Sequence, residues 1–195
     1  MIAIIDYNAG NIKSVANALE RLGCSYTLTS DPEVIRKAEK VILPGVGAAS
    51  EAMADLEAKG LIPVIRSLRQ PVLGICVGLQ VLCRDSEEGD VRCIGIFDSH
   101  VRRFQPSAEA KVPHMGWNAI GNCDSKLLKG IDGGSFVYFV HSYYPTLCPD
   151  TIATCRHGRE MFSAALKYEN FYGTQFHPEK SGSIGEHILR NFISL

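Results

Sequence analysis

Hydrophobic and polar positions alternate along the first part of the chain in a pattern that predicts strands and helices in turn. The run at residues 1–6 is apolar almost throughout, which is typical of a parallel strand covered on both faces. Apolar residues then recur at helical spacing until Gly23, a residue type that commonly ends a helix. The expected elements are strands at 1–6, 25–30 and 40–43 and helices at 12–22 and 32–38. This order predicts a parallel sheet with right-handed crossover connections.

The second half of the chain has a different pattern. The first half closes with a helix at 51–59 capped by Ser50, a helical piece at 62–68 and a strand that begins at Gln70. Strand-like segments with short connections then follow at 94–104, 112–120, 135–144, 151–156, 161–167 and 171–176. Such segments favour antiparallel pairing, so hairpins are expected to extend the parallel core. The last helix is expected to begin with a capping box formed by Ser183 and Glu186.

Composition and charge narrow the class of protein. The 195 residues are expected to form a single domain, 1–195, because no linker or low-complexity tract divides them. The 20 basic and 21 acidic residues are interspersed, so neither nucleic acid nor a membrane surface is expected as a partner. With no leader-like segment and no apolar run of transmembrane length, a cytoplasmic protein is expected. The seven cysteines include no C-x-x-C pair and are expected to be reduced thiols, without a disulfide framework or zinc site.

One cysteine stands at the corner between an expected buried strand and an expected helix. Cys76 is flanked by Gly74 and Gly78, and this spacing permits a cramped backbone at the corner because the neighbours lack a Cβ. The corner side chain then projects above the sheet edge, where a thiol is suited to act as a nucleophile. The alternative is a buried core cysteine, which is a common use of this residue.

A cysteine nucleophile needs a base and a group that orients the base. His177 directly follows an expected strand, and Pro178 favours an extended conformation before it, so His177 and Glu179 project to the same side. One tripeptide thus offers both the base and the carboxylate that holds its ring. Two alternatives stay open. The tripeptide can be a surface turn, or His141 can be the base, although its mid-strand place favours a hydrogen-bonded structural histidine.

Acyl transfer also requires N–H donors for the oxyanion that develops in the transition state. The N–H of Val77, immediately after the nucleophile, is expected to be one donor. The other is expected from the loop of Gly45, Val46 and Gly47, which follows another parallel strand and can bring bare backbone close to the site. The alternative is a glycine-rich turn without a ligand. Phosphate binding is disfavoured because neither a G-K-[ST] nor a G-x-G-x-x-G pattern accompanies the loop.

The elbow at 74–80, the loop at 44–47 and the strand end at 176–179 together resemble the class I (triad) glutamine amidotransferases. A closer resemblance, to the glutaminase subunits of imidazole glycerol phosphate synthases, is carried by segments 6–11, 111–118, 138–144 and 175–181. Its most specific mark is the Pro-His-Met-Gly-Trp run at 113–117. The resemblance implies a three-layer, flavodoxin-like α/β fold with a mostly parallel central sheet extended by antiparallel strands.

The resemblance also implies roles for individual residues. Cys76, His177 and Glu179 match a triad that hydrolyses glutamine to glutamate and ammonia through a γ-glutamyl thioester. The residues implied to hold the glutamine are Gly45 with its loop, Gln80, Glu88, Ser142 and Tyr143. No cofactor or metal is implied. The chain departs from the family pattern at Ala49, Val77, Leu79 and 91–97, none of which removes a catalytic group.

A partner protein is implied as well. In this family the ammonia passes to a (β/α)8-barrel cyclase subunit, in a heterodimer that serves histidine biosynthesis. The residues that match interface positions are Asn8, Asn11, Trp117, Tyr138 and Lys180. Core packing is the alternative for Trp117. Two further readings are kept open for the whole chain: delivery of ammonia to a different synthase or γ-glutamyl hydrolysis, and a catalytically silent regulatory subunit.

Overall fold

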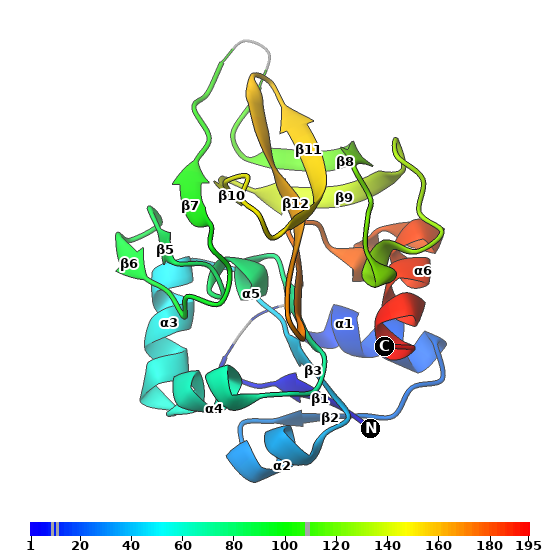
Figure 1. The fold of residues 1–195 in the computed structure, drawn as a ribbon. Helices are drawn as coiled ribbons and strands as arrows, with labels where there is room; N and C mark the ends of the chain where they lie inside the picture. The colour runs from blue at the N-terminus through cyan, green and yellow to red at the C-terminus, as the bar shows by residue number, and fades with distance from the viewer. Residues whose placement is uncertain (9, 11, 108–109) are drawn as a thin grey trace.

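A nine-stranded sheet forms the centre of the molecule (Figure 1). The structure is a computed structural model and describes residues 1–8, 10, 12–107 and 110–195. Across the sheet the strands follow the order β2 (Tyr26–Thr29), β1 (Ile2–Ile5), β3 (Lys40–Leu43), β4 (Val72–Ile75), β13 (Phe171–Thr174), β12 (Glu160–Tyr168), β11 (Thr151–His157), β8 (His114–Gly121) and β9 (Phe136–His141).

Parallel strands form one half of this sheet and antiparallel strands the other. β2, β1, β3 and β4 run parallel, as the alternation of apolar strands and amphipathic helices predicts. β13 also pairs parallel with β4, with Thr174 opposite Ile75. From β13 outward the pairs are antiparallel. The α/β class is therefore confirmed, as is the extension of a parallel core by antiparallel strands.

Helices cover both faces of the parallel strands. They are α1 (Ile12–Arg21), α2 (Pro32–Lys37), α3 (Ala49–Ala58), α4 (Leu61–Ser67), α5 (Val77–Gln80) and α6 (Gly182–Ile193), with short 3₁₀ helices η1 (Lys126–Leu128) and η2 (Pro178–Lys180). Figure 1 shows α1 and α6 on one side of these strands and α3 and α4 on the other. The apolar stripe of α1 faces inward, since Val15 and Leu19 are buried.

The segment at 94–104 does not form the single strand that its apolar run predicts. Only its last part is a strand, β7 (His100–Arg103), in a small four-stranded sheet ordered β10 (Tyr143–Pro145), β7, β5 (Asp85–Ser86) and β6 (Val91–Arg92). The N–H groups of Ile94 and Ile96 donate to the carbonyls of Val81 and Leu82 just beyond α5, each at 2.8 Å. The apolar run therefore closes the end of that helix instead of pairing with a strand.

The cap of α3 differs from the one expected. Asp31 caps α2, since its carboxylate accepts from the N–H of Glu33 at 2.8 Å. Ser50, however, lies inside α3, which begins at Ala49. The carboxylate of Glu88 accepts from the N–H of Ala49 at 2.9 Å, so an acid distant in sequence occupies the position that a local serine was expected to fill.

The capping box expected at the start of α6 is also wrong. Ser183 lies within the helix, and the N-cap position belongs to Ser181. The Ser181 hydroxyl is engaged elsewhere: it donates to the carbonyl of His177 at 2.6 Å and accepts from the N–H of Tyr138 at 2.9 Å. This serine therefore ties β9 to the turn that carries His177.

The core is continuous from the first strand to the last helix. Ile4, Leu73, Phe139, Phe162 and Phe192 are each 0–1% exposed and belong to one cluster of buried side chains. Burying side chains of this size stabilises a fold by about 1.5–3 kcal/mol each. All seven cysteines are free thiols in the structure. Among the described residues, no helix combines the length and the apolar character that crossing a bilayer requires.

Candidate active site

The elbow has the strained geometry that its flanking glycines predict. Cys76 lies between β4 and α5 with φ 54° and ψ −109°, a positive φ that non-glycine residues rarely adopt. A Cβ on Gly74 would lie 2.6 Å from the carbonyl oxygen of Gly78, and a Cβ on Gly78 would overlap the carbonyl oxygen of Leu43. Glycine is therefore required at both positions, because α5 packs directly on the backbone of β4 and of the residue that ends β3.

Strand β13 brings the candidate base beside the thiol. The N–H of Cys76 donates to the carbonyl of Thr174 at the end of β13, at 2.8 Å. His177 follows this strand, and its Nδ1 lies 2.8 Å from Oε1 of Glu179, with side chains that are 1% and 0% exposed. Nε2 of the ring is buried, and the ring interacts with the Cys76 thiol, which acts on its pKa. The structure thus brings together the three residues of the predicted triad.

Two opposing influences act on the pKa of His177. Burial is the largest and lowers the pKa, but the Cys76 thiol and the Glu179 carboxylate together outweigh it and raise the pKa to about 10. A raised pKa makes the neutral imidazole a stronger base. His177 is therefore equipped to accept the proton of the thiol and to hold it until a leaving group needs it.

A cavity of about 320 Å³ opens in front of the thiol. Its lining contains Val46, Gly47, Cys76, Val77, Gln80, Glu88, Ser142 and Tyr143, which are the predicted oxyanion and substrate residues apart from Gly45. Pro113, Val140 and His141 complete it. A cavity of this size suits a single free amino acid, with an apolar wall and a few convergent polar groups.

Gly45 supports the cavity from behind. A Cβ on Gly45 would lie 2.6 Å from the backbone nitrogen of Gly78 and 2.7 Å from the hydroxyl of Tyr7. That hydroxyl is buried and donates to the carbonyl of Pro44 at 2.6 Å. The loop that carries Val46 and Gly47 is thus anchored at its start by a buried tyrosine and packed against α5, so Gly45 serves by close packing and not by lining the cavity.

Gln80 presents a hydrogen-bond acceptor to the cavity. Both N–H groups of its amide are taken, one by the carbonyl of Tyr143 at 3.0 Å and one by Oε1 of Gln175 at 2.9 Å. Among the described residues its own carbonyl oxygen has no partner. An acceptor in this place suits an ammonium group of a ligand.

Glu88 combines two roles at the cavity wall. It lines the cavity, and it accepts from the N–H of Ala49. Burial raises the pKa of its carboxyl group, and the Ala49 hydrogen bond partly offsets this effect. The capping contact holds the carboxylate at the wall without removing its capacity to meet a cation.

His141 is a structural histidine and not a competing base. Its Nδ1 lies 2.7 Å from the carbonyl of Tyr143, and its Nε2 lies 3.0 Å from Nδ1 of His114. Burial lowers the pKa of His141 to about 3 and that of His114 to about 4. His157 stacks on His114 with ring centroids 4.1 Å apart. Neutral rings that are already hydrogen-bonded have no capacity left for the thiol's proton.

Trp117 and Tyr138 lie on an exposed apolar face and not in the core. Trp117 is 55% exposed and meets Tyr138 edge to face, with ring centroids 6.1 Å apart. Met115 and Phe136 on the same pair of strands are 63% and 57% exposed. We call these four residues the β8–β9 apolar face. Core packing, the alternative for Trp117, is therefore wrong.

The other predicted interface residues lie at two neighbouring turns. Lys180 ends η2 and is exposed, and the rim of Trp117 reaches within 3.8 Å of where a Cβ on Gly182 would lie. Asn8 is exposed with φ 72° in the turn after β1. Asn11 lies outside the described residues.

Sequence reasoning missed Gln175 as a residue of the site. It is 0% exposed, and its Nε2 lies 3.6 Å from Sγ of Cys76. The only local signal is its place two residues before His177, because alternate residues of an extended segment project to one side. Its partner stands far away in sequence, so no local pattern marks the contact.

A known family covers nearly the whole chain. The sequence model described as "Glutamine amidotransferase class-I" matches residues 3–195. The chain belongs to the class-I glutamine amidotransferase family. The elbow, the loop at 44–47 and the His-Pro-Glu turn of this amidotransferase all lie inside the matched residues.

Relatives within the family are similar over their whole length. "Imidazole glycerol phosphate synthase subunit HisH" from Bacteroides thetaiotaomicron is 55% identical over 195 residues, covering 100% of this chain and 99% of the relative. "Imidazole glycerol phosphate synthase subunit HisH 2" from Legionella pneumophila is 46% identical over 196 residues, covering 100% of this chain and 98% of the relative.

Solved structures share the fold of this amidotransferase at low sequence identity. A structure described as a glutamine amidotransferase has a TM-score of 0.73 at 18% identity, covering 100% of this chain and 98% of that one. A glutamine amidotransferase from Thermotoga maritima has a TM-score of 0.64 at 17% identity, covering 99% of this chain and 82% of that one. These likenesses support the family's α/β fold.

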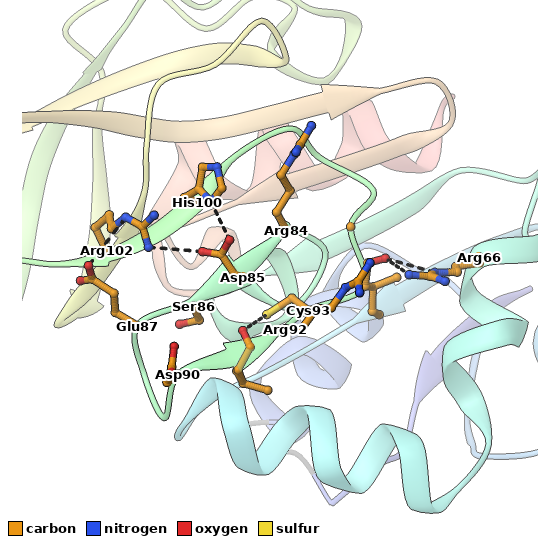
Figure 2. Close-up of a pocket in the computed structure, with 13 residues that line it drawn as sticks. Arg66, Arg84, Asp85, Ser86, Glu87, Asp90, Arg92, Cys93, His100 and Arg102 are labelled. Carbon is orange, nitrogen blue, oxygen red and sulfur yellow. Dashed lines mark hydrogen bonds and ion pairs between the residues drawn. The ribbon is translucent and has the colours of Figure 1, made fainter.

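A larger cavity, of about 770 Å³, lies over the small sheet and is shown in Figure 2. Part of its charged lining is paired: Asp85 lies 2.6 Å from the ring of His100 and 3.3 Å from the guanidinium of Arg102. Arg66 donates to the carbonyl of Ile94. Burial, aided by Asp85, raises the pKa of the Cys93 thiol at its wall to about 12. The thiol that interacts with a buried imidazole, Cys76 with His177, belongs instead to the smaller cavity, whose wall Cys76 lines.

Proposed function

We propose that this chain is the glutaminase subunit of an imidazole glycerol phosphate synthase. The observation that carries the proposal is that Cys76 lines a cavity of about 320 Å³ and interacts with His177, whose buried ring is paired with Glu179. Relatives that are 46–56% identical over this whole chain and carry the name of that synthase subunit support the same function. The reaction is the hydrolysis of glutamine to glutamate and ammonia.

The first step forms a thioester. Nε2 of His177 takes the proton of the Cys76 thiol, and the sulfur attacks the γ-carbonyl carbon of glutamine. We assign the N–H of Val77 and the backbone of Val46 and Gly47, all of which line the cavity, as the donors to the resulting oxyanion. When the C–N bond breaks, His177 gives its proton to the departing ammonia.

The second step releases glutamate. His177 takes a proton from a water molecule, whose oxygen attacks the thioester carbon, and the C–S bond breaks to regenerate Cys76. Glu179 accepts the Nδ1–H throughout and stabilises the imidazolium each time it forms. No metal or cofactor is required by these steps.

Substrate recognition follows from the polar groups at the wall. We assign the ammonium group of glutamine to Glu88 and to the carbonyl oxygen of Gln80, which are both acceptors. The backbone of Ser142 and Tyr143 lines the same cavity and is assigned to the rest of the amino-acid moiety. Gly45 keeps the oxyanion loop close to α5.

The partner is proposed to be a (β/α)8-barrel cyclase subunit that consumes the ammonia in histidine biosynthesis. The β8–β9 apolar face supports a docking role, because large exposed apolar side chains grouped on one face mark interaction sites. Asn8, Asn11 and Lys180 are proposed to belong to the same interface. The free cysteines support a reducing, cytoplasmic setting for the heterodimer.

Co-purification with the cyclase of the same cell tests the proposal. Glutamate release is measured for the complex with and without the cyclase's nucleotide substrate. We expect low activity from the isolated chain and stimulation in the complex. Absence of stimulation would assign the chain to a different synthase.

The Cys76→Ala variant tests the chemistry in the same assay. Loss of the nucleophile is expected to lower glutamate release by at least about a thousandfold, because no other group can form the thioester. Binding to the cyclase should persist, since the thiol is 4% exposed and lies inside the cavity wall. Retained hydrolysis by this variant would refute the mechanism, whereas no glutamate release from the wild-type complex would favour a catalytically silent subunit.

A further inference from the structure

A buried chain of hydrogen bonds leads from the thiol of Cys76 to one backbone carbonyl. Nε2 of Gln175 lies 3.6 Å from Sγ, and Oε1 of Gln175 accepts from Gln80 at 2.9 Å. The second N–H of Gln80 donates to the carbonyl of Tyr143 at 3.0 Å. Gln80 and Tyr143 line the cavity but Gln175 does not, so the amide of Gln175 meets the sulfur on a side away from the cavity.

The direction of each hydrogen bond in this chain is determined. The Tyr143 carbonyl can only accept, so Gln80 must turn its NH₂ group toward it. The remaining N–H of Gln80 then requires an acceptor, which is Oε1 of Gln175. Gln175 is therefore left with its NH₂ group directed at the sulfur. The carbonyl of Tyr143 thus determines that Gln175 presents an N–H donor, and not an acceptor, to the thiol.

A second branch holds the same carbonyl from the other side. His141 donates to it from Nδ1 at 2.7 Å, and Nε2 of His141 accepts from Nδ1 of His114 at 3.0 Å. Nε2 of His114 in turn accepts from the amide of Asn118 at 3.1 Å. Every ring nitrogen in this branch has a defined role, so Tyr143 is held by side chains that cannot reverse without losing a hydrogen bond.

A hydrogen-bond donor at this position stabilises the ionised form of the thiol more than the neutral form. When the proton moves from Sγ to Nε2 of His177, the sulfur becomes negatively charged in a buried site, where a hydrogen bond to a charged group is worth more than one to a neutral group. Gln175 and His177 stand two residues apart after β13 and both face Cys76, one as donor and one as base.

We propose that Gln175 is a further catalytic residue, whose amide N–H stabilises the thiolate of Cys76 under the orientation set by Gln80 and Tyr143. The proposal rests on the glutaminase function proposed above. It assigns to the residue before the Phe-His-Pro-Glu run a task distinct from substrate binding. Because Gln175 faces the sulfur and not the cavity, its loss affects the reactivity of the thiol and not the affinity for glutamine.

Alkylation of Cys76 by iodoacetamide tests the proposal in the isolated full-length chain. The rate is followed from pH 5 to pH 10 on the peptide that contains Cys76, and Cys76→Ser supplies the background from the other thiols. We compare wild type with Gln175→Met, which keeps the volume but removes the donor, and with Gln175→Glu, which keeps an acceptor for Gln80 but adds a charge.

At pH 7 we expect wild type to be alkylated fastest, Gln175→Met more slowly and Gln175→Glu most slowly. Gln175→Met should react about tenfold to a hundredfold more slowly than wild type, with the pH midpoint of its alkylation profile moved upward. In the complex, glutamine hydrolysis by this variant should lose kcat while KM stays within about threefold. Gln70→Met is the matched control. It is the same substitution, it removes a hydrogen bond to the carbonyl of Ile35, and it should leave the alkylation profile unchanged.

Two results separate this proposal from the proposed function. Alkylation of Gln175→Met at the wild-type rate, with an unchanged pH midpoint and intact thermal unfolding, would overturn the role of Gln175 even if the complex hydrolyses glutamine. Slower alkylation of Gln175→Met with a raised pH midpoint would support the role of Gln175 even if the wild-type complex shows no glutaminase activity. If Gln175→Met does not fold, the Gln175→Glu profile alone decides, because that variant preserves the contact with Gln80.

Discussion

His177 and Glu179 illustrate how burial and pairing act on single residues of the site. The side chains are 1% and 0% exposed, so a carboxylate there requires a partner. The Nδ1–H of His177 provides it, and this contact fixes the tautomer of the ring and leaves Nε2 for proton transfer. The carboxylate thus contributes orientation and charge and not a proton of its own.

Replacing Glu179 with glutamine is expected to weaken glutamine hydrolysis without abolishing it. The amide oxygen can still accept the Nδ1–H, but it cannot stabilise the imidazolium with a full charge. We expect kcat to fall by about a hundredfold to ten-thousandfold. Glutamate release by the complex measures this effect, and a rate within about twofold of wild type would remove Glu179 from the triad.

A pH prediction follows from the buried histidines. The pKa values of His114 and His141, about 4 and about 3 in the folded chain, lie below the ordinary value of 6.5. A lowered pKa contributes stability that is present above the unfolded value and lost as the pH falls through the folded value. The free energy of unfolding is therefore expected to fall between pH 6.5 and about pH 3.

Urea unfolding at several pH values between about 7 and 4 measures this loss. Carboxylates also titrate in this range, so the comparison is with His141→Gln, whose side chain does not titrate but can still donate to the carbonyl of Tyr143. The variant should lose less stability on acidification than wild type. If the free energy of unfolding falls equally with pH in the two proteins, the fold does not hold His141 in its neutral form.

At the scale of elements, backbone contact and not side-chain packing sets the position of α5. Gly78 is the sharpest case, because a Cβ there would overlap the carbonyl oxygen of Leu43. Gly78→Ala is expected to destabilise the fold by about 1–3 kcal/mol or more, since neither backbone segment can move away independently. Urea unfolding gives the value directly.

Gly121→Ala is the control for this variant. A Cβ on Gly121, within β8, would make an ordinary 3.5 Å contact with Thr154. This substitution should change the free energy of unfolding by less than about 1 kcal/mol. Equal stability of the two variants would contradict the close approach of α5 to the end of β3.

The chemistry of the site was predictable from sequence where a local constraint marks the residue. The glycines around Cys76 and the proline after His177 restrict the backbone within a few residues, and Cys76 and His177 have the expected backbone conformations. The extended segment expected through Glu179 is wrong, since Glu179 meets His177 from the 3₁₀ helix η2. Contacts between distant residues left no such mark. Glu88 caps α3 and Gln175 meets the thiol across sequence separations of 39 and 99 residues, and neither contact has a local pattern.

Some predicted boundaries of helices and strands were wrong for a related reason. An apolar run indicates burial but does not say whether its N–H groups pair with a strand or with the end of a helix, and 94–104 divides between the two. Ser50 and Ser183 satisfy a cap pattern by sequence, yet each helix begins earlier. The assignment of 1–195 to a single domain stays a prediction.

At the scale of the whole molecule, the β8–β9 apolar face is the surface to test for docking. Trp117→Ala is expected to weaken binding to the cyclase by at least about thirtyfold, because large exposed aromatics anchor interfaces. Calorimetric titration of the complex measures the change. Thermal unfolding of the isolated variant should shift little, since the ring is 55% exposed before binding.

Leu28→Ala provides the matched control. Leu28 is 46% exposed on β2, at the other end of the strand order from β8 and β9. The substitution removes a similar exposed apolar side chain and should leave the affinity for the cyclase unchanged. If both variants bind as wild type does, the β8–β9 apolar face is not the docking surface.

The position of β13 in the sheet has a consequence for synthesis of the chain. β13 is the last strand to be made, yet it lies between β4 and β12, near the middle of the sheet order. Until it leaves the ribosome, β4 lacks its neighbour on one side, and Cys76 lacks both the Thr174 carbonyl and the base that follows it. A nascent chain therefore carries the nucleophile without the means to activate it. We therefore expect Cys76 to gain its activated reactivity only after β13 and His177 have been made.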